Sequence, residues 1–110
     1  MIRVIIERKV KKGKEIECRE LVSELRSKAV HQPGYVTGET WVDDHDPHLW
    51  VIISTWIGPE LWQSWQSSPE RQAITAKLEP LLAVPERTRV LQSWGAVEVD
   101  WNVRHTLRAA

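Results

Sequence analysis

Glu7 is the carboxylate in this sequence that is best placed to act as a general base. It lies in a run of β-branched residues that reads as a strand, where alternation puts it on the face of Ile5, opposite Val4 and Ile6. If that face lies under helices, burial would raise the pKa of the carboxyl toward the range of a base. On the other face, Glu7 would be solvated or paired with a lysine at the strand end.

Trp65 is the aromatic side chain most suited to contact a substrate. It follows Leu61 by four residues, which places both side chains on one face of a short helix. An indole that points inward from this face either fills the core or forms the wall of a pocket. We predict substrate binding for Trp65 and keep the core interpretation as its alternative.

Other reactive side chains are better explained by structure than by chemistry. Cys18 falls on the apolar stripe of a helix, where a thiol behaves as a small hydrophobic group. His45 and His48 lie among aspartates, but their spacing is weak for a metal site and no third group of ligands appears. We therefore expect a buried thiol, a solvated loop and no metal site.

The elements that position these residues follow an alternating order. Strands are expected over residues 2–10, 35–43, 49–56 and 88–94, with a helix over 14–31 and two shorter helices that begin at Pro59 and Pro69. Gln32-Pro33-Gly34 should end the first helix, and Ser68-Pro69-Glu70 should begin the last one. This order predicts an α+β, ferredoxin-like split βαβ sandwich, in which an antiparallel sheet carries helices on one face.

Two strands are too apolar for a sheet with one wet face. Residues 4–6 and 49–53 are unbroken apolar runs, whereas a half-exposed strand should alternate. The helices can cover one face only, so the other face needs a partner. A second copy related by two-fold symmetry is the simplest partner, and we predict a homodimer.

Composition narrows the function classes. The 110 residues suit one domain, and 15 basic against 15 acidic side chains leave no net charge, which argues against nucleic-acid binding. No apolar run approaches the length of a membrane span, so we expect a soluble cytoplasmic protein without membrane contact. Seven tryptophans and no phenylalanine indicate large flat surfaces that are buried or presented to a ligand. Residues 95–110 form a tail whose alternating Val97, Val99 and Trp101 could add an edge strand.

The assembled pattern resembles the antibiotic biosynthesis monooxygenase family over residues 1–94. The resemblance is carried by Lys-Lys-Gly-Lys-Glu at 11–15, Gln-Pro-Gly-Tyr-Val-x-Gly-Glu-Thr at 32–40, Ser-Thr-Trp at 54–56, Trp62, Trp65 and Ser68-Pro69. It implies a dimeric α+β barrel and a pocket between sheet and helices in each subunit. The family contains cofactor-free oxygenases of anthrones and quinols, haem-degrading enzymes and members of unknown role.

The family's catalytic sets carry over only in part. Trp65 matches the tryptophan of the haem-degrading branch, but Glu7 stands at its asparagine position and Thr75 at its iron-binding histidine position. The quinol-oxygenase branch often has histidines where this chain has Trp65 and Glu70. Haem degradation is therefore disfavoured, and no cofactor is expected.

Residues and resemblance together predict a cofactor-independent monooxygenase-like protein for a small electron-rich aromatic such as a phenol, hydroquinone or anthrone. Trp65 would wall the substrate, and Glu7 would be the base. The alternative is a non-catalytic dimeric module, a ligand-binding or stress-related protein whose tryptophans are core.

Overall fold

The computed structural model describes residues 1–94 of the 110-residue chain. The elements follow in the order β1 (Ile2–Lys9), α1 (Glu15–Ala29), β2 (Tyr35–Val42), β3 (Leu49–Trp56), α2 (Pro59–Gln66), α3 (Pro69–Leu78), a 3-10 turn (Glu79–Leu81) and β4 (Arg87–Gln92). The predicted elements are all present, with ends that differ by one or two residues. The predicted tail strand lies outside the described residues.

The strands form one antiparallel sheet in the order β2-β3-β1-β4. Ile2 pairs with Trp56 of β3 on one side and with Gln92 of β4 on the other, so β1 is a central strand. The register between β2 and β3 shifts near Tyr35, at the start of β2. Strands that are distant in sequence therefore meet in the middle of the sheet.

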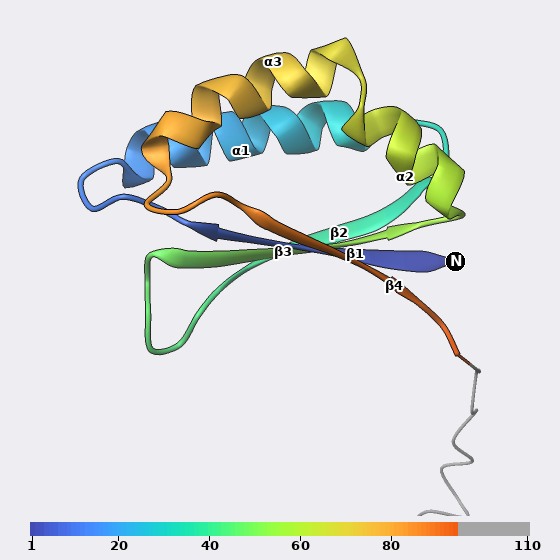
Figure 1. The fold of residues 1–110 in the computed structure, drawn as a ribbon, viewed down its shortest axis with the longest axis horizontal. Helices are drawn as coiled ribbons and strands as arrows, with labels where there is room; N and C mark the ends of the chain where they lie inside the picture. Colours follow the sequence, from blue (N-terminus) through green and yellow to red (C-terminus); the bar gives the residue numbers. More distant parts are fainter. Residues whose placement is uncertain (95–110) are drawn as a thin grey trace, which may run out of the picture.

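All three α-helices lie on the same face of this sheet (Figure 1). α1 and α3 contact each other, and Lys28 of α1 forms an ion pair of 3.1 Å with Glu70 of α3. This arrangement confirms the predicted α+β, ferredoxin-like fold. The dimeric barrel involves a second copy of the chain and stays a prediction. Within residues 1–94, no helix has the length and apolar character needed to cross a membrane.

Local sequence signals explain where the helices begin and end. Ser68 caps α3 because its hydroxyl accepts a hydrogen bond of 3.2 Å from the Arg71 amide, and Pro69 occupies the first turn. Gly34 adopts a φ of +86° in the turn before β2, and a Cβ there would overlap the Leu61 side chain. Pro80 lies in the 3-10 turn that follows the end of α3.

The core lies between the helices and the covered face of the sheet. Along β1, the side chains of Ile2, Val4, Ile6 and Arg8 are buried in alternation with more exposed neighbours. The buried hydrophobic residues from the rest of the described chain are Val10, Cys18, Val22, Leu25, Trp50, Trp56, Trp62, Trp65, Ile74, Leu78 and Leu82. Tryptophan thus supplies much of the core volume.

The opposite face, which we call the open face, carries a mixed set of side chains. It is formed by the alternate residues Arg3, Ile5, Glu7 and Lys9 of β1, Leu49, Val51, Ile53 and Thr55 of β3, Thr37, Glu39 and Trp41 of β2, and Arg87, Arg89 and Leu91 of β4. No described element covers this face (Figure 1). Trp41, at 58% exposed, is its largest apolar side chain.

Candidate functional site

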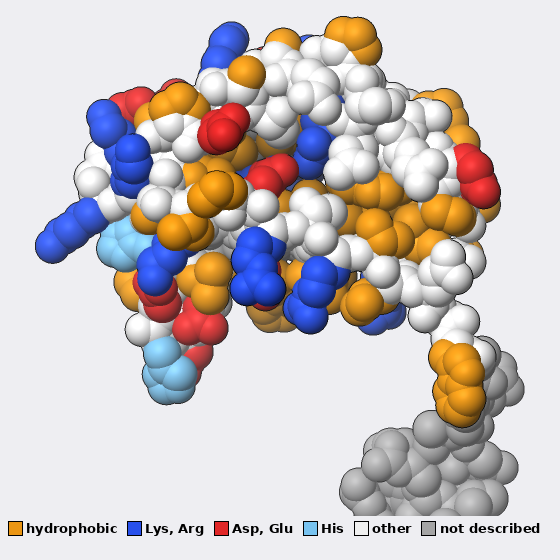
Figure 2. Space-filling model, in the orientation of Figure 1, with side chains coloured by type: hydrophobic (Ala, Val, Ile, Leu, Met, Phe, Trp, Pro, Cys, Tyr) orange, Lys and Arg blue, Asp and Glu red, His pale blue; other side chains and the backbone are white. Residues whose placement is uncertain are grey.

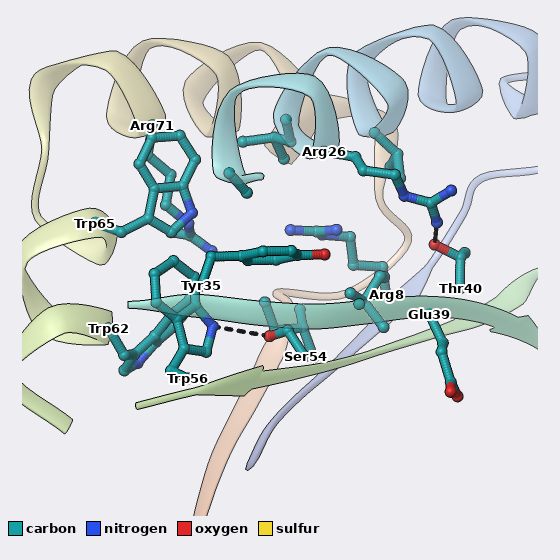
Figure 3. Close-up of a pocket in the computed structure, with 16 residues that line it drawn as sticks. Arg8, Arg26, Tyr35, Glu39, Thr40, Ser54, Trp56, Trp62, Trp65 and Arg71 are labelled. Atoms are coloured by element: carbon teal, nitrogen blue, oxygen red, sulfur yellow. Dashed lines mark hydrogen bonds between the residues drawn. The ribbon is translucent and has the colours of Figure 1, made fainter. Parts of the chain in front are cut away.

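A cavity lies between the covered face of the sheet and the helices, in the region drawn in Figure 3. The centre of a water-sized sphere can occupy about 60 Å³ of it, and its mouth opens to the outside. One water needs only roughly 10–15 Å³ by this measure, so the cavity is large enough for a small ligand. Its walls are mostly apolar, with polar groups at Arg8, Arg26, Tyr35, Thr40, Ser54 and Arg71.

Aromatic side chains form one end of the cavity. The rings of Tyr35 and Trp56 meet edge to face with centroids 5.5 Å apart, and those of Trp56 and Trp62 are 5.6 Å apart. Trp56 is held in place because its indole Nε1 donates a hydrogen bond of 3.1 Å to the Ser54 hydroxyl. These contacts come from β2, β3 and α2, so the aromatic wall exists only in the folded chain (Figure 3).

Tyr35 extends across the middle of the cavity (Figure 3). Its hydroxyl lies so close to Gly38 that a Cβ at that position would overlap it. The absence of a side chain at Gly38 therefore allows the phenol ring to lie along the sheet. Any residue larger than glycine would push Tyr35 into the remaining space.

Trp65 lies on α2 and lines the cavity with its indole. It is also 4% exposed and belongs to the hydrophobic core. The two interpretations of this residue, pocket wall and core, are therefore compatible in the structure. A substrate-binding role for Trp65 stays a prediction.

Two buried arginines that line the cavity form a charged cluster with Glu86, which lies outside its lining. Arg8 of β1 donates from Nε to Glu86 Oε2 at 2.8 Å, and Arg71 Nη2 of α3 lies 3.6 Å from Glu86 Oε1. The Arg71 guanidinium also lies 5.3 Å from the centre of the Trp62 ring, a cation–π distance. Basic and acidic side chains meet between the helix layer and the sheet in Figure 2.

The remaining polar side chains of the lining either bond to each other or turn away from the cavity. Arg26 of α1 donates a hydrogen bond to the Thr40 hydroxyl of β2. Glu39 contributes to the lining, but its side chain extends away from the cavity, and its carboxylate accepts a hydrogen bond of 2.8 Å from Trp41 Nε1 (Figure 3). Among the described residues, no carboxylate or imidazole side chain points into the cavity.

Glu7 lies on the open face and does not line the cavity. The helices cover the face of Val4 and Ile6, so the condition that would make Glu7 a buried base is not met. Its side chain is 33% exposed, and its carboxylate lies 3.7 Å from Arg89 Nη2 rather than beside a lysine. Alternation was predicted correctly, but which face the helices cover depends on the tertiary fold.

The other sequence candidates lie away from the cavity. Cys18 is buried in the core, and burial raises the pKa of its thiol. His48 Nε2 lies 2.8 Å from Glu15 Oε1 and ties the β2–β3 loop to the start of α1. The Thr75 hydroxyl donates within α3 to the Arg71 carbonyl at 3.1 Å. In residues 1–94, no group of three or more acidic, histidine or cysteine side chains could hold a metal ion.

Sequence reasoning missed Arg8, Tyr35 and Arg71, although signals for both arginines were present. Arg8 shares the inward side of its strand with Val4 and Ile6. Arg71 precedes Ile74 and Leu78 by three and seven residues on the buried stripe of α3. A charged side chain at an inward position of an otherwise apolar pattern indicates a buried ion pair or a ligand contact.

The fold and the cavity define a ferredoxin-like α+β domain with an internal aromatic pocket. Residues 1–77 match the family described as antibiotic biosynthesis monooxygenase. The chain therefore belongs to the antibiotic biosynthesis monooxygenase family. No curated protein sequence gives a significant match.

Solved structures share the fold at low sequence identity. A conserved protein from Methanosarcina mazei Go1 is 18% identical to this chain with a TM-score of 0.79. The match covers 83% of this chain and 90% of that protein's chain. Rv0793 from Mycobacterium tuberculosis is 14% identical with a TM-score of 0.79, and the match covers 88% of this chain and 98% of that of Rv0793. SnoaB from Streptomyces nogalater, a cofactor-independent oxygenase, is 14% identical with a TM-score of 0.77, and the match covers 87% of this chain and 95% of that of SnoaB. At these identities the likeness extends to the fold alone.

Proposed function

We propose that this protein is a cofactor-independent monooxygenase that acts on a small electron-rich aromatic such as a phenol, hydroquinone or anthrone. The observation that carries the proposal is the cavity, in which Tyr35, Trp56, Trp62 and Trp65 supply flat apolar walls beside two arginines. Membership in the antibiotic biosynthesis monooxygenase family supports it, as does the shared fold of the oxygenase SnoaB.

The proposed reaction needs no redox cofactor, because the substrate supplies all the electrons. In an anthrone, the ring CH₂ loses a proton, the resulting carbanion forms a C–O bond with dioxygen, and the peroxide anion so formed takes up a proton to become a hydroperoxide. Loss of water from this hydroperoxide leaves a C=O group. One oxygen atom enters the product and the other leaves as water, while the carbon is oxidised from CH₂ to C=O.

In this scheme, the protein positions the substrate and stabilises its charge. Trp62 and Trp65 contact the aromatic ring, and the apolar walls exclude water from the reactive anion. The arginines favour the negative charge that develops on the substrate oxygen when the proton leaves. The proton passes to solvent at the open mouth, since Glu7 lies on the other face of the sheet.

The same geometry favours a second candidate, a non-catalytic dimeric module that binds an aromatic ligand. The observation behind it is that no carboxylate or imidazole of the described residues points into the cavity. A pocket without a base binds ligands as well as one with a base. Measured turnover separates the two candidates.

We further propose that the open face is the dimer contact. Ile5, Val51 and Ile53 lie side by side at its centre, because Ile5 pairs with Ile53 in the β1–β3 register. A second sheet packed against them would bury this apolar centre and form the dimeric barrel that the family resemblance implies.

Oxygen uptake tests the proposed activity. The full chain is incubated with a panel of anthrones and hydroquinones in an oxygen-electrode cell, and a rate proportional to protein concentration is expected for at least one of them. Trp65→Phe should lower the rate by changing the wall, whereas Trp94→Phe is the matched control because Trp94 is fully exposed. Binding by calorimetry without oxygen uptake from any panel member would reject the enzyme and leave the binding module.

A further inference from the structure

The charges around the cavity do not balance. Arg8 and Arg71 are only 3% and 5% exposed, and both turn to the single carboxylate of Glu86. Arg26 adds a third guanidinium to the lining, while the Glu39 carboxylate extends away from it (Figure 3). Buried cations are normally matched by anions, so Arg8 and Arg71 together retain a positive charge that residues 1–94 do not neutralise.

One atom of the cluster lacks a hydrogen-bond partner. Arg71 Nη2 is buried, and no protein atom within residues 1–94 accepts a hydrogen bond from it. Its distance of 3.6 Å from Glu86 Oε1 is too long for one. Burial lowers the pKa of Arg71. The nearby Arg8 also lowers this pKa, whereas Glu86 raises it. An unsatisfied buried donor beside a pocket is a common sign of a ligand contact.

We propose that the cavity binds a single-ring aromatic as its anion, with the negatively charged oxygen held by Arg71 and Arg8. The aromatic walls fit the ring, and Trp62 already stacks with the Arg71 guanidinium at 5.3 Å. The centre of a water-sized sphere can occupy only about 60 Å³, so among the proposed substrates the cavity favours a single-ring phenol or hydroquinone over the fused rings of an anthrone. This inference deepens the proposed function and rests on the same cavity.

The anion could be a carboxylate or an ionised phenol, since both offer a charged oxygen to a guanidinium. For a phenol, the arginines would also replace a general base, because they make the ionised form the more stable one inside the cavity. The site would then select substrates by acidity as well as by shape.

Calorimetry with benzoate and benzamide tests the carboxylate case. The two probes have nearly the same shape, and benzoate should bind the full chain at least about tenfold more tightly, a difference of roughly 1.4 kcal/mol. Equal affinities, or no binding of benzoate at millimolar concentration, would remove the carboxylate case.

The titration of 4-nitrophenol, followed by its absorbance, tests the phenol case. In the presence of saturating protein, the midpoint of its ionisation should fall by about one pH unit, which corresponds to tenfold preference for the anion. A rise in that midpoint would mean that the cavity prefers the neutral ring. The proposal is overturned if neither the benzoate arm nor the nitrophenol arm shows preference for the anion.

Substitution of an arginine and substitution of the carboxylate in the charged cluster should change the affinity for the aromatic anion in opposite directions. Arg71→Gln should weaken binding of the preferred anion about tenfold, and Arg89→Gln, which removes an arginine from the open face, should leave it unchanged. Glu86→Gln should strengthen binding, because it removes the carboxylate that competes for both arginines. A loss of fold alone cannot raise affinity, so weaker anion binding by a folded Glu86→Gln variant would overturn the proposal.

The outcomes for this inference and for the proposed function are separable. Oxygen uptake together with equal binding of charged and neutral probes would reject the anion site and keep the enzyme. Preference for the anion without oxygen uptake from any substrate would keep the anion site and favour the non-catalytic module.

Discussion

The two faces of the sheet use the same strands for different purposes. Along β1, the side chains of Val4, Ile6 and Arg8 pack under the helices, while those of Ile5 and Glu7 lie on the open face. The covered face combines tryptophans and buried arginines around a cavity. The open face combines aliphatic side chains at its centre with charged ones around them. We infer that the covered face carries ligand chemistry and that the open face carries association between chains.

Ion pairs on the two faces illustrate this difference. Arg8 and Glu86 meet at 2.8 Å beside the cavity, where the Arg8 side chain is 3% exposed and the Glu86 side chain is 26% exposed. Glu7 and Arg89 lie 3.7 Å apart on the open face, with side chains that are 33% and 61% exposed. An exposed pair contributes little to stability, whereas a buried pair controls the electrostatic potential of the site around it.

Truncation of Trp65 should have the largest effect on stability. Because this side chain is almost completely buried, Trp65→Ala should lower the free energy of unfolding by about 3 to 5 kcal/mol. Trp94→Ala should change it by less than about 0.5 kcal/mol, because Trp94 is fully exposed. Urea denaturation of both variants measures the difference. A loss below about 1 kcal/mol for Trp65→Ala would show that this part of the covered face is not core.

A charge at the centre of the open face should separate the chains without unfolding them. Ile53→Lys places an ammonium group in the proposed dimer contact, and in a separated chain it faces Glu39, its register partner on β2. We expect the dimer to dissociate at least about tenfold more readily. Sedimentation equilibrium at micromolar concentration should show a dimer for the natural sequence and a folded 12.8 kDa species for the variant. A monomeric natural protein would contradict this assignment.

Neutralising Glu7 should have only a small effect. Glu7→Gln removes an exposed ion pair, so the free energy of unfolding should fall by less than about 1 kcal/mol. Any oxygen uptake should keep its rate, because Glu7 lies on the face opposite the cavity. A large loss of rate with unchanged substrate binding would instead restore Glu7 as the base and imply that the reaction takes place on the open face.

The protein should not bind haem specifically. By the family resemblance, Thr75 stands at the position of the iron-binding histidine, and a threonine cannot replace an imidazole ligand. Its hydroxyl is hydrogen-bonded within α3. We expect no saturable shift of the Soret band at one haem per chain. A saturable shift that disappears on substitution of a single histidine would show that the residue correspondence is wrong.

The fold could be predicted from the sequence because its signals are local. Ser68 and Pro69 mark the start of α3, and the alternation around Val4 and Ile6 marks a strand, without reference to any other segment. Trp65 was found in the same way, by its spacing from Leu61 on α2.

The charged part of the site could not be predicted, because it depends on contacts between distant segments. Arg8 and Glu86 are 78 residues apart in the chain, and the pairing of β1 with β4, which begins directly after Glu86, helps to bring them together. For the same reason the sequence left open whether Glu7 faces the helices or the opposite side, since alternation does not say which face the helices will cover. Tyr35 reaches the cavity only because Gly38 leaves room for its hydroxyl.

Nuclear magnetic resonance of the indole N–H groups tests most directly whether the covered face is the ligand site. Signals are assigned with single Trp→Phe variants, and the preferred aromatic ligand is then titrated into the ¹⁵N-labelled full chain. We predict that the signals of Trp56, Trp62 and Trp65 shift together and saturate, while those of Trp41 and Trp94 do not. Saturable shifts confined to Trp41, on the open face, would contradict the account.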